Sequence, residues 1–319
     1  MNNVFKEVTP NAADKLGFGI YHFGQAGVDA FGNKENNIFA YHGYDREQCN
    51  YQESLGYMNF YSYHIDEYSL MHLRRIREMG CVTWMHYLPF VTADIKGNKK
   101  FLLKHGWKDE ITKQVETCKK AGLWDTVAGF QYDEPLLHCD GETFEEFSKF
   151  MATFGKRQLG VFSIYEIKEG THPRSNDPEF GMTAHVINPD NTRYLTDVAY
   201  DWYHDADYDK YKELNELMLN DMQRDDVYVW GVPTTWTYYG NPNFTEDLCM
   251  RNLDMHVKLL DSVRYAGGLF CYTWRSWGKK GEGLDFKFDT NNPERWTRLQ
   301  DKMIEVGKQL SNTTLKKIV

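Results

Sequence analysis

Short apolar runs alternate with segments of helical periodicity along most of the chain. The apolar runs have the length and the β-branched and aromatic content of buried strands, and they lie at residues 16–24, 57–65, 81–90, 127–135, 159–167, 197–203, 226–236 and 268–278. Between them, apolar residues recur every three or four positions at residues 66–80, 99–121, 141–158, 207–225, 245–267 and 292–310. Thr245 is a predicted N-cap, and Pro293 marks a predicted helix start.

Eight strand-like runs that alternate with helices are typical of a (β/α)8 TIM barrel, and a length of 319 residues suits one such domain. We therefore predict an α/β fold in which residues 1–319 form a single barrel domain. Residues 168–196 hold several Gly and Pro residues and are predicted to form a long loop insertion. The main alternative is an open doubly wound sheet, but no GxGxxG motif follows the first strand.

Composition and charge narrow the class of partner. Aromatic residues make up 15% of the chain, which favours surfaces that stack on flat faces such as those of sugar rings or bases. The net charge of -9 disfavours nucleic acid, which repels an acidic surface, whereas a neutral sugar is indifferent to it. No apolar run approaches the roughly 18 residues that a membrane span needs, so we expect no membrane partner.

The cysteines and the N-terminus bear on cofactors and location. Six cysteines are scattered without CxxC pairs, which argues against a zinc site and a disulfide framework and fits a reducing compartment. The first ten residues hold neither the apolar core nor the cleavage site of a signal peptide. We expect a cytoplasmic protein that needs no cofactor. The alternative is a secreted protein whose signal has been removed.

Polar and aromatic residues end nearly every predicted strand. In a barrel the active site lies where the carboxyl ends of the strands meet, so these residues converge on one rim. Aromatic faces pack against the apolar face of a pyranose, while acids and His bind its hydroxyl groups. The predicted substrate-binding residues are Tyr21, His86, Tyr132, Tyr200, Tyr203, Trp236, Tyr272 and Trp274.

The most informative strand end is the sequence QYDEP, in which Asp133 and Glu134 follow an apolar run and precede Pro135. Glycoside hydrolysis needs an acid to protonate the leaving oxygen and a group to stabilise the positively charged sugar. A neighbouring carboxylate and aromatic walls both raise the pKa of such an acid. Because adjacent strand residues point to opposite faces, Asp133 and Glu134 have different roles unless the strand has already turned at Pro135.

This layout resembles that of barrel-fold glycoside hydrolases. The large retaining clan of cellulases and β-galactosidases has Asn-Glu on strand four and a second Glu ending strand seven, but VYVWGVPTTW holds no carboxylate. The β-hexosaminidase and chitinase-like group resembles the chain more closely, through the acidic pair, through Tyr200 and Asp201 in AYDWY, and through Trp274 in CYTW. Chitinases space their acids with an intervening residue, so the adjacent pair is nearer to the β-hexosaminidases.

The resemblance implies that Glu134 is the general acid and that Asp133 is the partner of a substrate acetamide group. The predicted function is a glycoside hydrolase that acts on an oligosaccharide or polysaccharide, with Glu134, Asp133 and Asp201 as catalytic residues. The second catalytic group stays open. Either Asp133 assists an N-acetylhexosamine substrate, or Asp201 acts as nucleophile or base.

Two other functions fit parts of the pattern. The missing acid on strand seven is compatible with a carbohydrate-binding barrel that has no catalytic activity. A metal-dependent hydrolase is the second alternative, because three His residues from adjacent strands can bind zinc, namely His22, His64 and His86.

Overall fold

The computed structural model describes residues 14–24, 60–64, 69–78, 80–86, 90–95, 98–168, 186–203, 205–237, 241–273, 281–288 and 292–318. Eight of the described strands are parallel neighbours in a closed barrel. In order around the barrel they are β1 (Gly17–Gly24), β2 (Phe60–His64), β3 (Val82–His86), β6 (Val127–Asp133), β7 (Arg157–Ser163), β8 (Asp197–Asp201), β9 (Tyr228–Gly231) and β10 (Ala266–Cys271). The prediction of a (β/α)8 barrel is confirmed.

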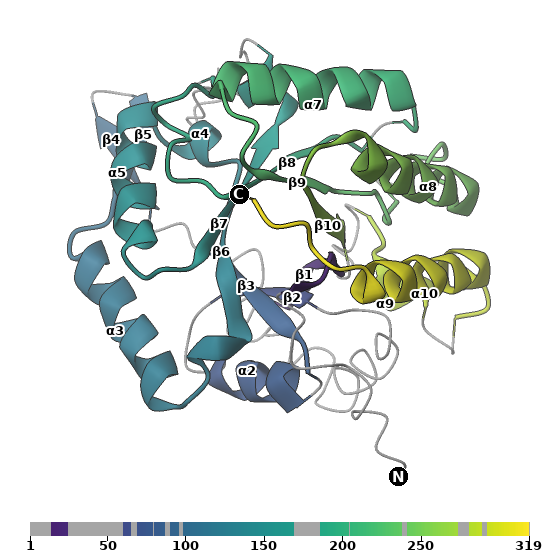
Figure 1. The fold of residues 1–319 in the computed structure, drawn as a ribbon, viewed down its shortest axis with the longest axis horizontal. Coiled ribbons are helices and arrows are strands. Elements are labelled where there is room, and N and C mark those ends of the chain that lie inside the picture. Colours follow the sequence, from purple (N-terminus) through teal and green to yellow (C-terminus); the bar gives the residue numbers. More distant parts are fainter. Residues whose placement is uncertain are drawn as a thin grey trace.

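Helices form a ring around these strands (Figure 1). The long helices are α2 (Ser69–Glu78), α3 (Trp107–Lys120), α5 (Gly141–Ala152), α7 (Tyr208–Met222), α8 (Glu246–Ser262) and α10 (Thr297–Asn312). Shorter helical turns are the 3-10 helix η4 (Trp124–Thr126), α4 (Pro135–His138), α6 (Ile164–Ile167) and α9 (Leu284–Lys287). Thr245 caps α8 as predicted, since its side chain accepts a hydrogen bond from the Leu248 N–H.

The sequence prediction was wrong between β3 and α3. The predicted strand over 81–90 ends at His86, and the predicted helix over 99–121 begins only at Trp107. The intervening chain forms an antiparallel hairpin of β4 (Phe90–Ile95) and β5 (Asn98–Leu103). A run of consecutive apolar residues such as Phe-Leu-Leu at 101–103 fits a strand and a helix equally well, so periodicity alone did not separate them.

Other boundaries also differ from the prediction; for example, β9 ends at Gly231 and α8 at Ser262, both five residues early. The fifth barrel strand, expected over 159–167, ends at Ser163, because Ser163 and Glu166 form a capping box that starts α6. The last helix begins at Thr297 and not at Pro293. Most of the loop predicted over 168–196 lies outside the described residues; residues 186–196, which are described, hold turns and no helix.

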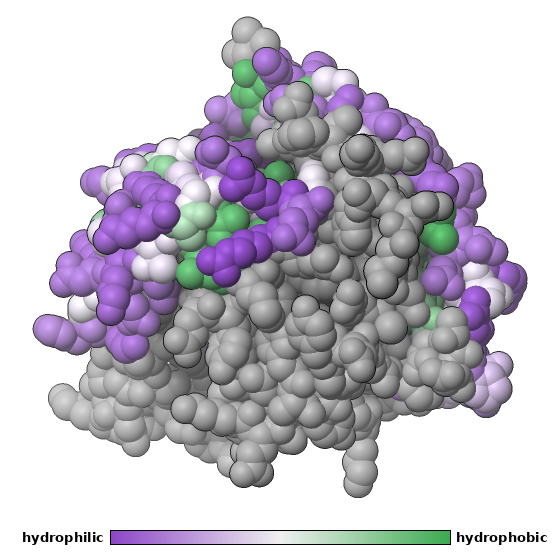
Figure 2. Space-filling view, turned by 90° about the horizontal axis from the view of Figure 1, so that it is seen from below, coloured by the Kyte–Doolittle hydropathy of each residue, from purple (hydrophilic) through white to green (hydrophobic). Residues whose placement is uncertain are grey.

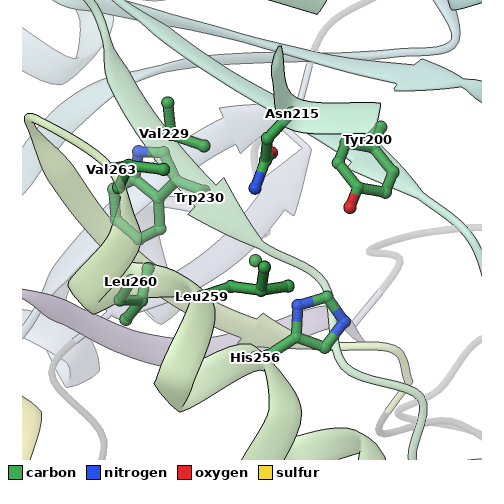
Figure 3. A pocket seen from close by; sticks show the side chains of 9 residues that line it. Tyr200, Asn215, Val229, Trp230, His256, Leu259, Leu260 and Val263 are labelled. Carbon is green, nitrogen blue, oxygen red and sulfur yellow. The ribbon is translucent and has the colours of Figure 1, made fainter. Parts of the chain in front are cut away.

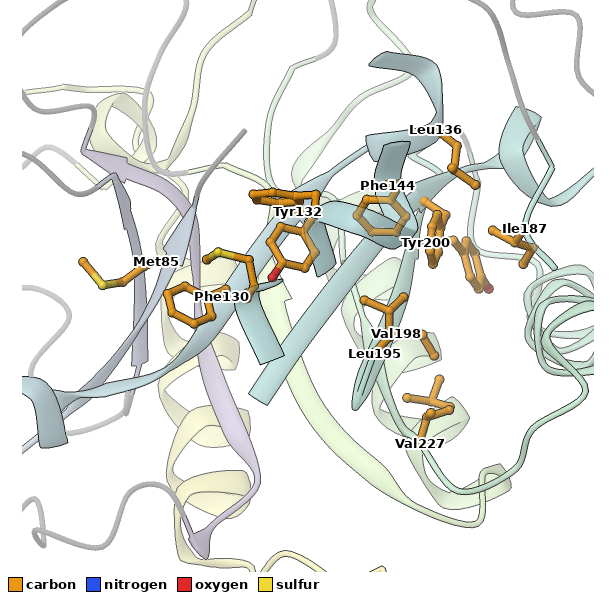
Figure 4. Close-up of a cluster of buried hydrophobic side chains, with 14 of the residues drawn as sticks. Met85, Phe130, Tyr132, Leu136, Phe144, Ile187, Leu195, Val198, Tyr200 and Val227 are labelled. Atoms are coloured by element: carbon orange, nitrogen blue, oxygen red, sulfur yellow. The ribbon is translucent and has the colours of Figure 1, made fainter. Parts of the chain in front are cut away.

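Three hydrophobic clusters divide the core. The first two combine strand and helix residues and fill the space between the barrel and its helices; Figure 4 shows part of the first. The third draws its members from the strands and the ends that follow them, so it fills the barrel interior: Val82, Trp84, Leu159, Val161, Ala199, Trp230, Val232 and Phe270. Among the described residues, apolar side chains therefore occupy much of the middle of the barrel.

A buried ion pair closes the end of the barrel at which the strands begin. Asp197 is fully buried and accepts hydrogen bonds from Arg157 Nε at 2.9 Å, from Arg157 Nη2 and from Trp230 Nε1 at 2.6 Å. The Arg157 guanidinium also lies over the ring of Tyr228, 4.4 Å from its centroid. Because each charge has several partners, burial of this pair is tolerated.

The segment that precedes β1 pairs with the segment that follows α10 at the same end of the barrel. The Leu16 N–H donates to the carbonyl of Thr313 at 2.9 Å, and the Leu315 N–H donates to the carbonyl of Asp14 at 2.9 Å. On the face shown in Figure 2, the described surface is mainly hydrophilic, with only small hydrophobic areas. Among the described helices, none has the length and hydrophobicity to cross a membrane.

Candidate active site

Two carboxylates face the barrel axis at the carboxyl ends of two strands that flank β7. On β6, Tyr132 belongs to the helix-facing cluster, so Asp133 points inward by strand alternation. On β8, Tyr200 belongs to the same outer cluster, and Asp201 points inward. Strand β7 lies between β6 and β8. The fold thus brings Asp133 and Asp201 to one rim, both partly buried.

The two carboxylates influence each other electrostatically. Burial, and after it the negative charge of Asp133, raise the pKa of Asp201 to about 7. A hydrogen bond from the Tyr203 hydroxyl to Asp201 Oδ2, at 3.1 Å, opposes this shift in part. Near neutral pH Asp201 is therefore only partly ionised, which is the behaviour expected of two carboxylates that share a site.

Glu134 lies in a turn and no longer in the strand. Its backbone is left-handed, with φ 43° and ψ 50°, a conformation that is strained for a residue with a Cβ. The Glu134 N–H donates to the carbonyl of Val161 at 2.8 Å, and its carbonyl accepts from the Leu137 N–H at 3.0 Å. The strand thus breaks one residue before Pro135, and the strict alternation of faces does not apply to Glu134.

An aromatic cluster adjoins the acidic pair. The rings of Tyr203 and Tyr272 stack with centroids 4.8 Å apart and an interplanar angle of 22°. Trp236 meets Tyr272 edge to face at 5.1 Å, and because Trp236 is only 5% exposed it supports Tyr272 from behind. Both tyrosines pack on the cluster that fills the barrel. The structure thus brings together three predicted substrate-binding residues from the ends of three strands.

His86 faces the barrel interior beside β6. Its Cα is paired with that of Gln131, and its side chain is 8% exposed. Burial and the nearby His138 lower the pKa of His86 to about 4, so the imidazole is neutral at physiological pH. Burial also lowers the pKa of His138, although the charge of Asp133 opposes this. The rim therefore combines neutral imidazoles with carboxylates.

Two predicted substrate-binding residues lie on the wrong face for that role. Tyr132 is fully buried among Phe144 and Phe147 of α5 (Figure 4), and its hydroxyl donates to Gln158 Oε1 at 2.7 Å. Tyr200 is 3% exposed, and its hydroxyl donates to a carbonyl of α7 at 2.7 Å. Each precedes an inward Asp by one residue, so strand alternation places both tyrosines outside the barrel.

Several predicted residues cannot be placed in the site. Trp274 lies outside the described residues. Strands β1 and β2 are described, but the side chains of Tyr21, His22 and His64 are not. Among the residues that the structure does describe, no group of three or more His, Cys, Asp or Glu side chains is placed to hold a metal ion.

Two buried polar residues near the rim were not among the predicted catalytic or substrate-binding residues. Glu166 is fully buried, and its carboxylate accepts hydrogen bonds from two backbone N–H groups. Gln131 is fully buried on the inner face of β6, two residues before Asp133, and neither of its amide atoms has a partner. The Ser-x-x-Glu capping pattern at Ser163 was a readable signal for Glu166. No local signal distinguishes Gln131.

A small cavity lies in the layer between the barrel wall and the helices, beside β9, α7 and α8 (Figure 3). Its volume is about 10 Å³, which accommodates about one water molecule. His256 and Asn215 face it, and neither ring nitrogen of His256 has a hydrogen-bond partner. Burial lowers the pKa of His256 to about 3, so the ring is neutral. The cavity is too small for a sugar and is separate from the acidic pair.

The sequence matches none of the protein-family profiles and none of the curated proteins. The fold is similar to several solved structures. A β-glucuronidase from an uncultured Clostridium species gives a TM-score of 0.58 at 11% identity, over 91% of this chain and 50% of that chain. A candidate α-L-fucosidase from Bacteroides thetaiotaomicron gives 0.54 at 11%, over 93% and 94%. A GH113 β-1,4-mannanase gives 0.51 at 8%, over 89% and 99%.

The chain spans about half the length of that β-glucuronidase and nearly the full length of the other two proteins. At identities of 8% to 11% these similarities establish the barrel fold and no more. The function must therefore be argued from the site itself.

Proposed function

We propose that the protein is a glycoside hydrolase whose site lies at the carboxyl ends of β6, β8, β9 and β10. The observation that carries the proposal is the acidic pair Asp133 and Asp201, held at one rim beside the stacked rings of Tyr203 and Tyr272, with the pKa of Asp201 raised to about 7. A glycosidase needs carboxylates in both protonation states next to a surface that binds sugar rings. The fold, shared with structures named as glucuronidase, fucosidase and mannanase, agrees with this activity.

Glu134 is the general acid in this proposal. It lies at the end of β6, partly exposed, where the chain turns out of the barrel wall. Its carboxyl group donates a proton to the glycosidic oxygen as the bond to the leaving group breaks. The single negative charge that Asp133 and Asp201 share near neutral pH stabilises the positive charge that develops on the sugar.

The substrate decides between two routes. On a 2-acetamido sugar, Asp133 binds the acetamide group, whose oxygen attacks the anomeric carbon. On a sugar without this group, Asp201 is the nucleophile or base, and its separation from Glu134 determines retention or inversion. Because its pKa is raised, Asp201 is partly protonated near neutral pH and is a second candidate for the general acid. The test therefore substitutes both Glu134 and Asp201.

The test is a panel of chromogenic glycosides with and without a 2-acetamido group, hydrolysed by the parent and by the variants Glu134→Gln, Asp133→Asn and Asp201→Asn. We expect Glu134→Gln to lower kcat by roughly 10²–10⁴-fold while substrate binding persists. A chelator added to the parent tests the metal-dependent alternative. Full activity of Glu134→Gln on every substrate that the parent cleaves would show that Glu134 is not the acid.

A carbohydrate-binding barrel without catalysis is the second candidate. Its support is the end of β9, where Thr234 and Thr235 stand in place of a carboxylate. Glycan binding by the parent with no turnover of any glycoside would favour it.

A further inference from the structure

A single buried carboxylate ties together three segments of chain beside the acidic rim. Glu166 in α6 has no exposed surface. Its Oε2 accepts the Ser163 N–H at the end of β7, at 2.5 Å, and its Oε1 accepts the Leu136 N–H in α4, at 2.7 Å. Its carbonyl oxygen accepts the Ile187 N–H at 2.9 Å. The residue therefore links two barrel strand ends that are adjacent in the sheet but distant in sequence.

The bond to Leu136 replaces the missing cap of α4. The first N–H groups of a helix have no acceptor within the helix, and they are usually satisfied by the side chain of the N-cap residue. Glu134 is the N-cap of α4, yet its side chain makes no capping bond. Pro135 carries no N–H, so Leu136 is the first donor in need of an acceptor. Glu166 supplies it from the neighbouring strand end.

This arrangement bears directly on Glu134. The left-handed backbone of Glu134 is strained, and a strained residue keeps its conformation only where the surroundings fix it. On one side it is held by the bond from its N–H to Val161 in β7. On the other side it is held by α4, which Glu166 anchors through Leu136. Both constraints come from β7 and the turn that follows it.

We infer that Glu166 is a positioning residue: it caps α4 in place of Glu134 and thereby holds the Glu134 carboxyl group at the rim in an orientation that can serve the substrate. The inference rests on the proposed function only for the identity of the acid. The physical claim, that Glu166 fixes the turn at Glu134, is independent of the reaction.

The test uses Glu166→Gln, which keeps the size of the side chain but replaces one acceptor oxygen with an NH₂ group that cannot accept a hydrogen bond. Hydrolysis is measured on two glycosides of the same sugar, one with a good leaving group such as 2,4-dinitrophenolate and one with a poor leaving group. A good leaving group departs without a proton, so it does not need the general acid. A misplaced acid therefore slows only the poor substrate.

We expect Glu166→Gln to lower kcat by about 10²-fold on the poor substrate and by less than about 3-fold on the good one, with KM little changed on both. Glu134→Gln should show the same selectivity. Met218→Ala removes a buried side chain of α7 away from this turn and serves as the control, since general loss of structure slows both substrates equally. Equal slowing of both substrates by Glu166→Gln, or no slowing, would overturn the inference.

Amide hydrogen exchange over residues 134–139 gives a readout that does not depend on activity. The Glu166→Gln variant should exchange faster than the parent in this segment, while α7 keeps its protection. If the parent cleaves no glycoside but exchange rises as expected, the proposed function fails and the positioning role stands. Unchanged exchange overturns the positioning role. Should Glu166→Gln not fold, Glu166→Asp, whose shorter side chain keeps the carboxyl group but cannot span both N–H groups, is measured in the same way.

Discussion

At the scale of single residues, Asp201 links stability to the chemistry of the site. An ordinary Asp has a pKa near 3.9, whereas burial and the charge of Asp133 raise the pKa of Asp201 to about 7. Between these two values the folded protein holds a proton that the unfolded chain has already lost. Stability therefore falls as the pH rises through this window, and the whole penalty is present above pH 7.

Replacing Asp201 with Asn removes this penalty. Relative to the parent, Asp201→Asn should gain about 2 kcal/mol of unfolding free energy between pH 4 and pH 8, a value reduced for partial exposure. Denaturant unfolding at several pH values measures the difference between the two proteins. A difference that stays constant across this range would contradict the raised pKa. Asp133→Asn is the matched comparison. Loss of the neighbouring charge should lower the pKa of Asp201, so that stability falls over a narrower pH range, while burial still keeps that pKa above its ordinary value.

At the scale of elements, the ends of β8, β9 and β10 together build one aromatic surface. The Thr235 N–H donates to the carbonyl of Tyr272 at 2.7 Å, and the Tyr272 N–H donates to the carbonyl of Pro233 at 2.9 Å. These backbone bonds hold Trp236 and Tyr272 edge to face, while Tyr203 stacks on Tyr272. The middle ring therefore depends on all three strand ends.

Loss of this middle ring should weaken sugar binding more than chemistry. We expect Tyr272→Ala to raise KM roughly 10-fold with a smaller change in kcat, since stacking on one ring contributes on the order of 1 kcal/mol. Steady-state kinetics on a cleaved glycoside measures both constants. Tyr228→Ala, at the opposite end of β9, is the matched control and should leave KM unchanged. Equal effects of the two substitutions on KM would argue against a sugar-binding surface at the rim.

At the scale of the whole molecule, the two ends of the barrel carry different tasks. The end where the strands begin holds the buried pair Arg157 and Asp197. The two side chains form an ion pair, and Asp197 also accepts a hydrogen bond from Trp230 Nε1. The opposite end holds carboxylates whose environment raises the pKa of one of them. Such a division is expected of a barrel, in which stability and activity are separated along the axis.

Breaking the buried pair should therefore affect stability alone. Asp197→Asn leaves the Arg157 guanidinium without its charged partner and should cost about 3 kcal/mol of unfolding free energy. Activity per folded molecule should be unchanged. Chemical denaturation and active-site kinetics, measured on the same preparation, separate the two effects. Glu146→Gln removes the exposed ion pair with Lys108 and should change stability by less than about 1 kcal/mol.

The sequence by itself determined the features that depend on local patterning. Alternating apolar runs and helical stripes predicted the barrel, and Thr245 predicted the start of α8. Strand alternation would also have placed Tyr132 and Tyr200 outside the barrel, had it been applied to each strand end. The hairpin between β3 and α3 was missed, because a short apolar run satisfies both periodicities.

Only the tertiary structure decided how distant residues combine. In the chain, strand β7 and the helices around it separate Asp133 from Asp201, and parallel pairing of β6, β7 and β8 brings both to one rim. The cap of α4 likewise comes from Glu166, which follows the neighbouring strand β7. Periodicity records which face of its own element a residue occupies. Periodicity carries no information on which residues of other elements contact that residue. Burial, charge coupling and shared hydrogen bonds all depend on those contacts.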